Sequence, residues 1–208
     1  MKQPLAPLLT PPIQTDFYLE DEALFEQLAA ENFDYSYLTC RNLVLHDALL
    51  KRVTLQKSRL ERFEASNVIF RQCDFSNLEL LGASLHQVWF DQCKLTGANF
   101  AESYLRDCRF TDCVADFTSF SQTNLNVTAF ETCRLTEAEF YHSRWKDLTL
   151  QHCELTRSNW SATKLAQLDF SSNQFDAIAV SQEQLKGAIV TPEQALVFAR
   201  GLGLVIKL

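Results

Sequence analysis

The stretch that decides the fold, residues 93–113, reads CKLTGANFAESYLRDCRFTDC. Every fifth residue in it is large and apolar: Leu95, Phe100, Leu105 and Phe110. A small residue stands two positions before each of these: Cys93, Ala98, Ser103 and Cys108. Most of the other residues are polar or charged. The chain therefore places two residues of every five in an apolar environment.

A five-residue apolar period fits neither a helix nor a single straight strand. Five residues of an α-helix turn through about 500°, so the apolar residues would scatter around the axis. Along a strand, five steps place successive apolar residues on opposite faces. The chain must therefore turn a corner in every pentapeptide. Such a chain is a solenoid, in which each turn stacks on the last and buries an axial core.

The spacing of like residues predicts four sides per turn. Cysteines recur every twenty residues, at 73, 93, 113, 133 and 153. Large residues do the same, at Leu50, Phe70, Phe90, Phe110, Phe130, Leu150 and Phe170. A three-sided coil would instead stack Cys73 on Val88 and Ser103. From Leu45 to Val180 the register is unbroken, which predicts seven turns and a coil about 34 Å long.

This pattern resembles the pentapeptide-repeat proteins. The motifs CDFSNLEL (73–80), LTGANF (95–100) and ESYLRDCRF (102–110) are typical of that family. The resemblance implies an all-β solenoid, a right-handed quadrilateral β-helix. The end pieces LEDEA (19–23) and TPEQALVFARGLGLVI (191–206) are most similar to the Qnr quinolone-resistance proteins, in particular the chromosomal, loopless members of Gram-positive bacteria.

We expect three segments. Residues 1–40 form a proline-rich lead-in, followed by a short acidic capping helix at 19–28. Residues 41–185 form the pentapeptide-repeat β-helix. Residues 186–208 hold a C-terminal helix and a dimerisation tail. The helix begins after Thr191, with Pro192 in its first turn and Gln194 completing a capping box, and it ends near Arg200.

The composition suits one domain, with 208 residues, 47% of them hydrophobic, and a net charge of −7. The charge is uneven, since residues 1–40 carry −6, residues 41–72 carry +4, and residues 73–140 carry −6. No apolar run reaches the roughly 20 residues of a membrane span, and no signal peptide precedes the acidic start. We expect a cytoplasmic protein with reduced cysteines.

The cysteine ladder is interpreted as packing. Six of the seven cysteines occupy the small inward slot, where a free thiol behaves as a small hydrophobe. Stacked side chains point in parallel, with Cβ atoms about 4.8 Å apart, too far for an ordinary disulfide. A zinc site needs four converging ligands, which one wall of a stack does not offer. We expect no metal and no cofactor.

No catalytic site is expected. The sequence has no HExxH, GxSxG, GxGxxG or Walker-type motif. Its four histidines fall in scattered outward slots: His46, His86, His142 and His152. The coil axis is filled by Leu and Phe, which leaves no pocket for a substrate. The chain is predicted to be a binding protein.

Three surface features are candidates for contacts. The first is an acidic waist, formed by Asp91, Glu102, Asp107, Asp112, Asp116, Glu131, Glu137 and Glu139. The second is an outward apolar column, formed by Leu49, Ile69 and Trp89, which is either a contact surface or side-chain cover. The third is an apolar C-terminal surface predicted to join two copies, formed by Leu196, Phe198, Leu202, Leu204, Val205 and Ile206.

The resemblance to Qnr proteins implies the partner, a type II topoisomerase, either DNA gyrase or topoisomerase IV. In that family the β-helix is thought to imitate duplex DNA in size, shape and charge. The implied result is protection from fluoroquinolones, without any direct binding of nucleic acid. Several Qnr proteins carry loops tied to protection, for which the unbroken register leaves no room here. The alternative is a pentapeptide-repeat scaffold with a different partner.

Overall fold

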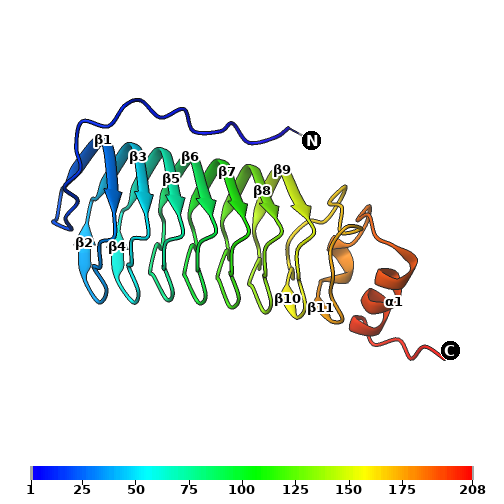
Figure 1. Ribbon diagram of the computed structural model, residues 1–208. Coiled ribbons are helices and arrows are strands. Elements are labelled where there is room, and N and C mark those ends of the chain that lie inside the picture. Colours follow the sequence, from blue (N-terminus) through cyan, green and yellow to red (C-terminus); the bar gives the residue numbers. More distant parts are fainter. Residues whose placement is uncertain (1, 208) are drawn as a thin grey trace.

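The computed structural model describes residues 2–207 and shows a rod built of stacked rectangular turns (Figure 1). It is the expected right-handed quadrilateral β-helix, but it has about eight turns where seven were predicted, and residues 2–207 contain a single α-helix, at the C-terminal end. Met1 and Leu208, the outermost residues of the predicted end segments, lie outside the described residues. The strands are β1 (Leu24–Glu31), β2 (Thr39–Arg41), β3 (Val44–Lys51), β4 (Arg59–Glu61), β5 (Glu64–Arg71), β6 (Ser84–Asp91), β7 (Tyr104–Thr111), β8 (Asn124–Glu131), β9 (Arg144–Gln151), β10 (Ser158–Asn159) and β11 (Ile178–Ala179). A 3-10 turn, η1 (Gln182–Gln184), and helix α1 (Pro192–Gly201) follow.

The register between neighbouring turns is twenty residues throughout. Seven long strands form one parallel sheet in the order β1-β3-β5-β6-β7-β8-β9, and Phe90 pairs with both Phe70 and Phe110. Two short parallel pairs, β2–β4 and β10–β11, lie elsewhere on the coil. The predicted four pentapeptides per turn are therefore confirmed. At about 4.8 Å per turn, eight turns give a coil about 38 Å long.

The corners of the coil are made by one residue in every pentapeptide. Every fifth residue from Glu22 to Gln167 has a positive φ, and only Gly82 and Gly97 among them are glycines. An isolated non-glycine residue pays a steric cost in this conformation. Here the stacked turns impose it even on Val127 and Phe117. The five-residue period required a corner in every pentapeptide, and the positive φ of one residue in each pentapeptide produces that corner.

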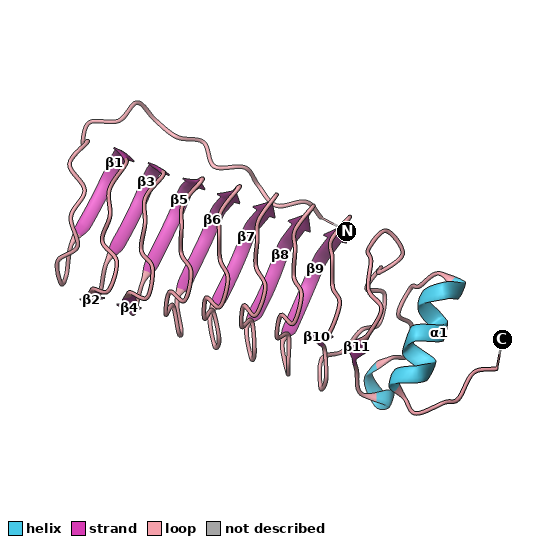
Figure 2. Cartoon of the chain, turned by 60° about the horizontal axis from the view of Figure 1, so that its bottom comes forward, coloured by secondary structure: helices cyan, strands magenta, loops and turns pink. Residues whose placement is uncertain are grey.

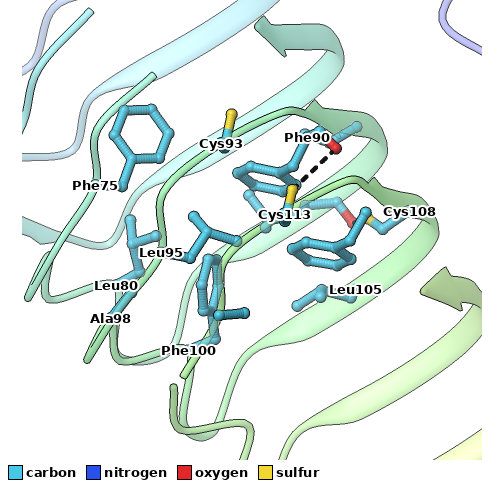
Figure 3. Packing of buried hydrophobic residues seen from close by; sticks show 14 of the residues in the cluster. Phe75, Leu80, Phe90, Cys93, Leu95, Ala98, Phe100, Leu105, Cys108 and Cys113 are labelled. Atoms are coloured by element: carbon cyan, nitrogen blue, oxygen red, sulfur yellow. Dashed lines mark hydrogen bonds between the residues drawn. The ribbon is translucent and has the colours of Figure 1, made fainter. Parts of the chain in front are cut away.

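The interior is a continuous apolar stack, part of which is seen in Figure 3. The Phe110 ring lies parallel to those of Phe90 and Phe130, with centroids 4.7 and 4.6 Å away. All seven cysteines are free and buried, as predicted. The Cys113 thiol, for example, points at the carbonyl oxygen of Phe90 at 3.4 Å (Figure 3). The cysteines therefore pack in the coil wall.

The helix predicted for residues 19–28 is wrong. Residues 24–31 form strand β1, which pairs in parallel with β3 and continues the twenty-residue register. Phe25 and Ala30 take the inward slots of an additional first turn, so the coil begins well before residue 41. Phe17 closes the open end, because its buried ring packs edge-to-face on Phe25 and Tyr35. An aromatic plug therefore covers the first turn in place of a helix.

The proline-rich lead-in is an extended arm that crosses the long sheet, from β1 toward β9 (Figures 1 and 2). We call residues 2–13 the arm. It follows one column of corner residues spaced by twenty positions, to which it hydrogen-bonds at Asp47, Asn67, Gln87, Asp107 and Asp147. The arm thus lies on the coil, where its backbone groups are hydrogen-bonded to the side chains of the corner residues.

The C-terminal helix forms as predicted. The Thr191 side chain accepts a hydrogen bond from the Gln194 backbone N–H, and the Gln194 side chain accepts from the Thr191 N–H. Gln194 also donates to the carbonyls of Phe170 and Asn173, both at 2.8 Å, which covers polar groups of the last turn. Helix α1 ends at Gly201, within one residue of the prediction. It closes the far end of the coil.

Candidate interaction surface

One edge of the coil carries three of the predicted acids. Asp91 and Glu131 end strands β6 and β8, two turns apart, and Asp112 lies at the corner that follows β7. Each strand-end carboxylate has a neighbouring base: Arg71 Nε is 2.7 Å from Asp91, and Arg109 Nε is 3.8 Å from Glu131. Asp112 is exposed and accepts a hydrogen bond from the Thr132 hydroxyl. Asp112 is therefore the least neutralised acid on this edge.

A second group of predicted acids lies around the opposite side of the coil. Glu102 is ten residues before Asp112, half of a twenty-residue turn, and it occupies an exposed corner. Glu139 is half-buried and accepts a hydrogen bond from Asn159 Nδ2 at 2.7 Å. Glu137 pairs with Arg157 Nε at 3.1 Å. The outward negative charge is thus divided between two opposite sides of the rod.

Two predicted surface acids are buried. Asp107 is 7% exposed, because the arm covers it: Leu5 donates its backbone N–H at 3.3 Å, and the Arg106 guanidinium lies 3.5 Å away. Asp116 is 8% exposed and accepts a hydrogen bond from Arg134 Nε at 2.6 Å, which raises the pKa of that guanidinium. Both carboxylates are engaged within the chain, so the expectation that they face a partner is corrected.

The apolar column is partly covered within the chain. Trp89 is half-buried, and its Nε1–H donates to the Thr111 hydroxyl at 3.0 Å. The Arg109 guanidinium lies over its ring at 5.7 Å from the centroid. A gap of only about 10 Å³ separates Trp89 from arm residues 4–7. The arm therefore supplies cover for the end of this column.

The arm contacts were not found from the sequence. Asp47 accepts the Thr10 N–H at 3.1 Å, Asn67 accepts the Leu8 N–H at 2.7 Å, and Asp147 accepts the Lys2 N–H at 3.1 Å. Gln87 donates in the opposite sense, to the Ala6 carbonyl at 2.7 Å. The sequence signal that could have revealed these contacts has two parts. Polar side chains recur at a spacing of twenty positions along one corner of the coil, and the proline-rich segment lacks backbone N–H donors at its prolines. The side chains of this column hydrogen-bond to the extended backbone of the arm.

The C-terminal surface is largely exposed. Leu196 and Leu202 are each 41% exposed, and Leu204 and Val205 are 62% and 91% exposed. Ile206 is half-buried, and the tail leaves the end of the rod as an extended segment (Figures 1 and 2). Phe198 is different, because it is buried against Phe170 and Phe175 of its own chain. Phe198 therefore caps the core and does not belong to the exposed surface.

The buried thiols of the interior are poorly placed for binding or covalent chemistry. Burial raises the pKa of the Cys108 thiol to about 12, and burial is also the main cause that raises the pKa of Cys93. These thiols are held protonated and away from solvent at neutral pH. Among residues 2–207, no three His, Cys, Asp or Glu side chains are grouped as metal ligands would be. Within the same range, no helix has the length and apolar character needed to span a membrane.

A four-sided coil of pentapeptide turns around a filled apolar core defines a class of repeat protein. Models of the pentapeptide repeat region match residues 83–160 and 127–190, and a model of eight pentapeptide repeats matches residues 65–97. The chain belongs to the pentapeptide-repeat family. An uncharacterised relative, YisX of Bacillus subtilis, is 41% identical over 167 residues, which cover 73% of this chain and 79% of YisX.

Solved structures of two other pentapeptide-repeat proteins are similar at low identity. A trypsin-treated form of QnrB1, a plasmid-mediated fluoroquinolone resistance protein, is 17% identical, with a TM-score of 0.30 over 86% of this chain and all of that treated chain. HetL, involved in heterocyst differentiation regulation in the cyanobacterium Nostoc, is 13% identical, with a TM-score of 0.34 over 85% of this chain and 94% of HetL. Scores this low say nothing about a shared partner.

Proposed function

We propose that this protein binds a type II topoisomerase, DNA gyrase or topoisomerase IV, at the surface that receives duplex DNA. Binding there modulates the enzyme and protects it from fluoroquinolones. The proposal is supported by the resemblance of residues 19–23 and 191–206 to Qnr proteins. The structural observation that carries it is the division of outward acids between two opposite sides of a rigid rod, represented by Asp112 and Glu102.

Electrostatics explains why such a rod would compete with DNA. Duplex DNA carries about one negative charge per 1.7 Å on two backbones, and proteins that bind it present basic surfaces. Exposed carboxylates on two sides of a coil offer those surfaces a similar, weaker field. Asp91, Glu131 and Glu137 are partly neutralised by arginines. Glu102 and Asp112 take part in no ion pair among residues 2–207, so these two carry most of this effect.

A homodimer would extend the rod. The exposed Leu196, Leu202, Leu204 and Val205 form an apolar surface at one end, where a two-fold axis could pair it with itself. Two coils of about 38 Å joined in this way would present a longer acidic body to the enzyme. Phe198 stays within each chain as part of the coil end.

Gyrase supercoiling, measured with and without ciprofloxacin, tests the proposal. We expect wild-type protein to bind gyrase, to compete with DNA, and to act less strongly as salt rises. The double variant Glu102→Lys/Asp112→Lys should lose most of this effect. Its matched control, Glu26→Lys/Asp176→Lys, changes the net charge equally at exposed sites outside the waist and should keep it.

Two outcomes contradict the proposal. If the waist variant and its control act equally, the opposed acids are not the contact. If the wild-type protein neither binds gyrase or topoisomerase IV nor alters supercoiling, the partner is another protein, and the chain is a scaffold of the alternative kind.

A further inference from the structure

The wall formed by the long strands is interrupted after β9. No backbone hydrogen bond joins residues 144–151 to residues 164–171 in the part of the chain that the structure describes. The interruption is local, because residues 164–171 do bond to the next turn: Leu165 N donates to Gln184 O at 3.0 Å. Elsewhere in the same turn the stacking continues, as β10 pairs with β11. We call this gap the seam.

Trp145 is the physical cause of the seam. It occupies a central slot, which in the turns before and after holds Leu125 and Leu165. Those leucines are fully buried, but Trp145 is only half-buried. Its Nε1–H donates to the Lys164 carbonyl at 2.6 Å. The indole thus takes an acceptor of the next turn and holds that turn away from β9.

At the other end of the seam, a side chain makes the same two cross-turn contacts that Ser103 makes earlier in the coil with Ala83 N and Leu80 O. The Asn173 amide donates to the Leu150 carbonyl at 3.1 Å, and its oxygen accepts the Cys153 N–H at 2.9 Å. Between Trp145 and Asn173, strand β9 is the edge of the seven-stranded sheet. An uncovered edge strand presents backbone donors and acceptors that a further strand can use.

The seam opens into a basic groove. The groove has a volume of about 770 Å³ and is lined by the first half of β9 together with Ala162, Lys164, Ala166, Gln167 and Gln184. Arg144, Lys146 and Lys164 are exposed there, and none of them takes part in an ion pair among residues 2–207. The one acid of the lining, Asp147, accepts the Lys2 N–H. The groove is therefore positive in a chain of net charge −7.

We propose that the seam is a docking groove for an extended acidic segment of a partner protein, which adds a strand to β9. Strand addition at an open sheet edge is an established mode of peptide recognition, in which the backbone supplies affinity and the side chains supply specificity. Carboxylates of the segment would meet Arg144, Lys146 and Lys164. This site is distinct from the acidic waist and does not depend on the proposed topoisomerase contact.

The test uses the full-length protein and a capped octapeptide of alternating glutamate and valine, with the lysine–valine peptide as the charge control. We expect the acidic peptide alone to bind, to change the fluorescence of Trp145, and to slow hydrogen exchange of amides in β9. Trp145→Leu should close the seam, as leucine does in neighbouring turns, and weaken binding at least about tenfold.

A charge-reversal pair separates docking from a general effect of folding. Lys146→Glu/Lys164→Glu should weaken binding at least about tenfold. Its matched control, Lys57→Glu/Arg62→Glu, has the same change in charge on another part of the coil and should bind as wild type does. The proposal is overturned if Trp145→Leu binds the acidic peptide as well as wild type does, or if no peptide binds. It is equally overturned if the seam takes single-stranded oligothymidine and not the peptide.

Discussion

Replacing Phe110 with alanine should destabilise the coil more than any comparable change at its end. Phe110 is completely buried, and its ring lies between Phe90 and Phe130, at 4.7 and 4.6 Å, with Phe100 and Phe120 packed edge-on. A buried Phe→Ala change costs about 3–5 kcal/mol in free energy of unfolding, because it removes apolar contact and leaves a cavity. Four aromatic neighbours place Phe110 near about 5 kcal/mol.

Urea unfolding followed by far-ultraviolet circular dichroism measures the effect. With an m-value of about 2.5 kcal/mol/M, the loss appears as a fall of about 2 M in the unfolding midpoint. Phe175 is the control, since it is half-buried at the coil end, where its ring packs edge-on against Phe170 and Phe198. Phe175→Ala should cost about 1–2 kcal/mol. Equal midpoint shifts for the two variants would refute the idea that the stacked axis stabilises the coil.

Three further changes test other parts of the structure. Cys108, whose pKa burial raises to about 12, should stay protonated at pH 8 and react with a maleimide only when the coil unfolds; rapid labelling of the native protein would contradict its burial. Thr191→Ala removes the capping box of α1 and should lower the free energy of unfolding by about 0.5–2 kcal/mol, whereas Glu193→Ala next to it should cost less, so equal losses would argue against the cap. Deleting residues 2–13 should increase acrylamide quenching of Trp89 while circular dichroism is unchanged; unaltered quenching would show that the arm does not cover this side chain.

The repeat made the coil predictable. Each turn repeats the same slots, so the period of five, the four sides and the inward residues were confirmed together by the twenty-residue strand register. Helix α1 was predictable for a different reason, because Thr191, Pro192 and Gln194 form a capping box within one local stretch.

The first turn could not be recognised in the same way. Phe25 and Ala30 fit the slots, but Glu20, Tyr35 and Cys40 stand where Leu or Phe recurs later. The acidic run around Glu20 was therefore interpreted as a helix, while strand pairing with β3 decided the outcome. Tertiary stacking overrides weak local preference.

The surface was predicted less well than the core. The burial of Asp107 depends on the path of the arm, and that of Asp116 on an arginine eighteen residues further along the chain. Neither contact can be predicted from the position of the acid within its pentapeptide alone. Trp145 has the apolar type that its slot requires, but its size opens the wall instead of filling the axis.

The central claim is tested most directly by binding of the purified protein to DNA gyrase in competition with a fluorescent duplex. The proposal predicts that unlabelled protein displaces the duplex, less effectively at high salt, and that Glu102→Lys/Asp112→Lys loses this activity while Glu26→Lys/Asp176→Lys retains it. A ternary complex in which gyrase holds both the duplex and this protein would contradict binding at the DNA surface.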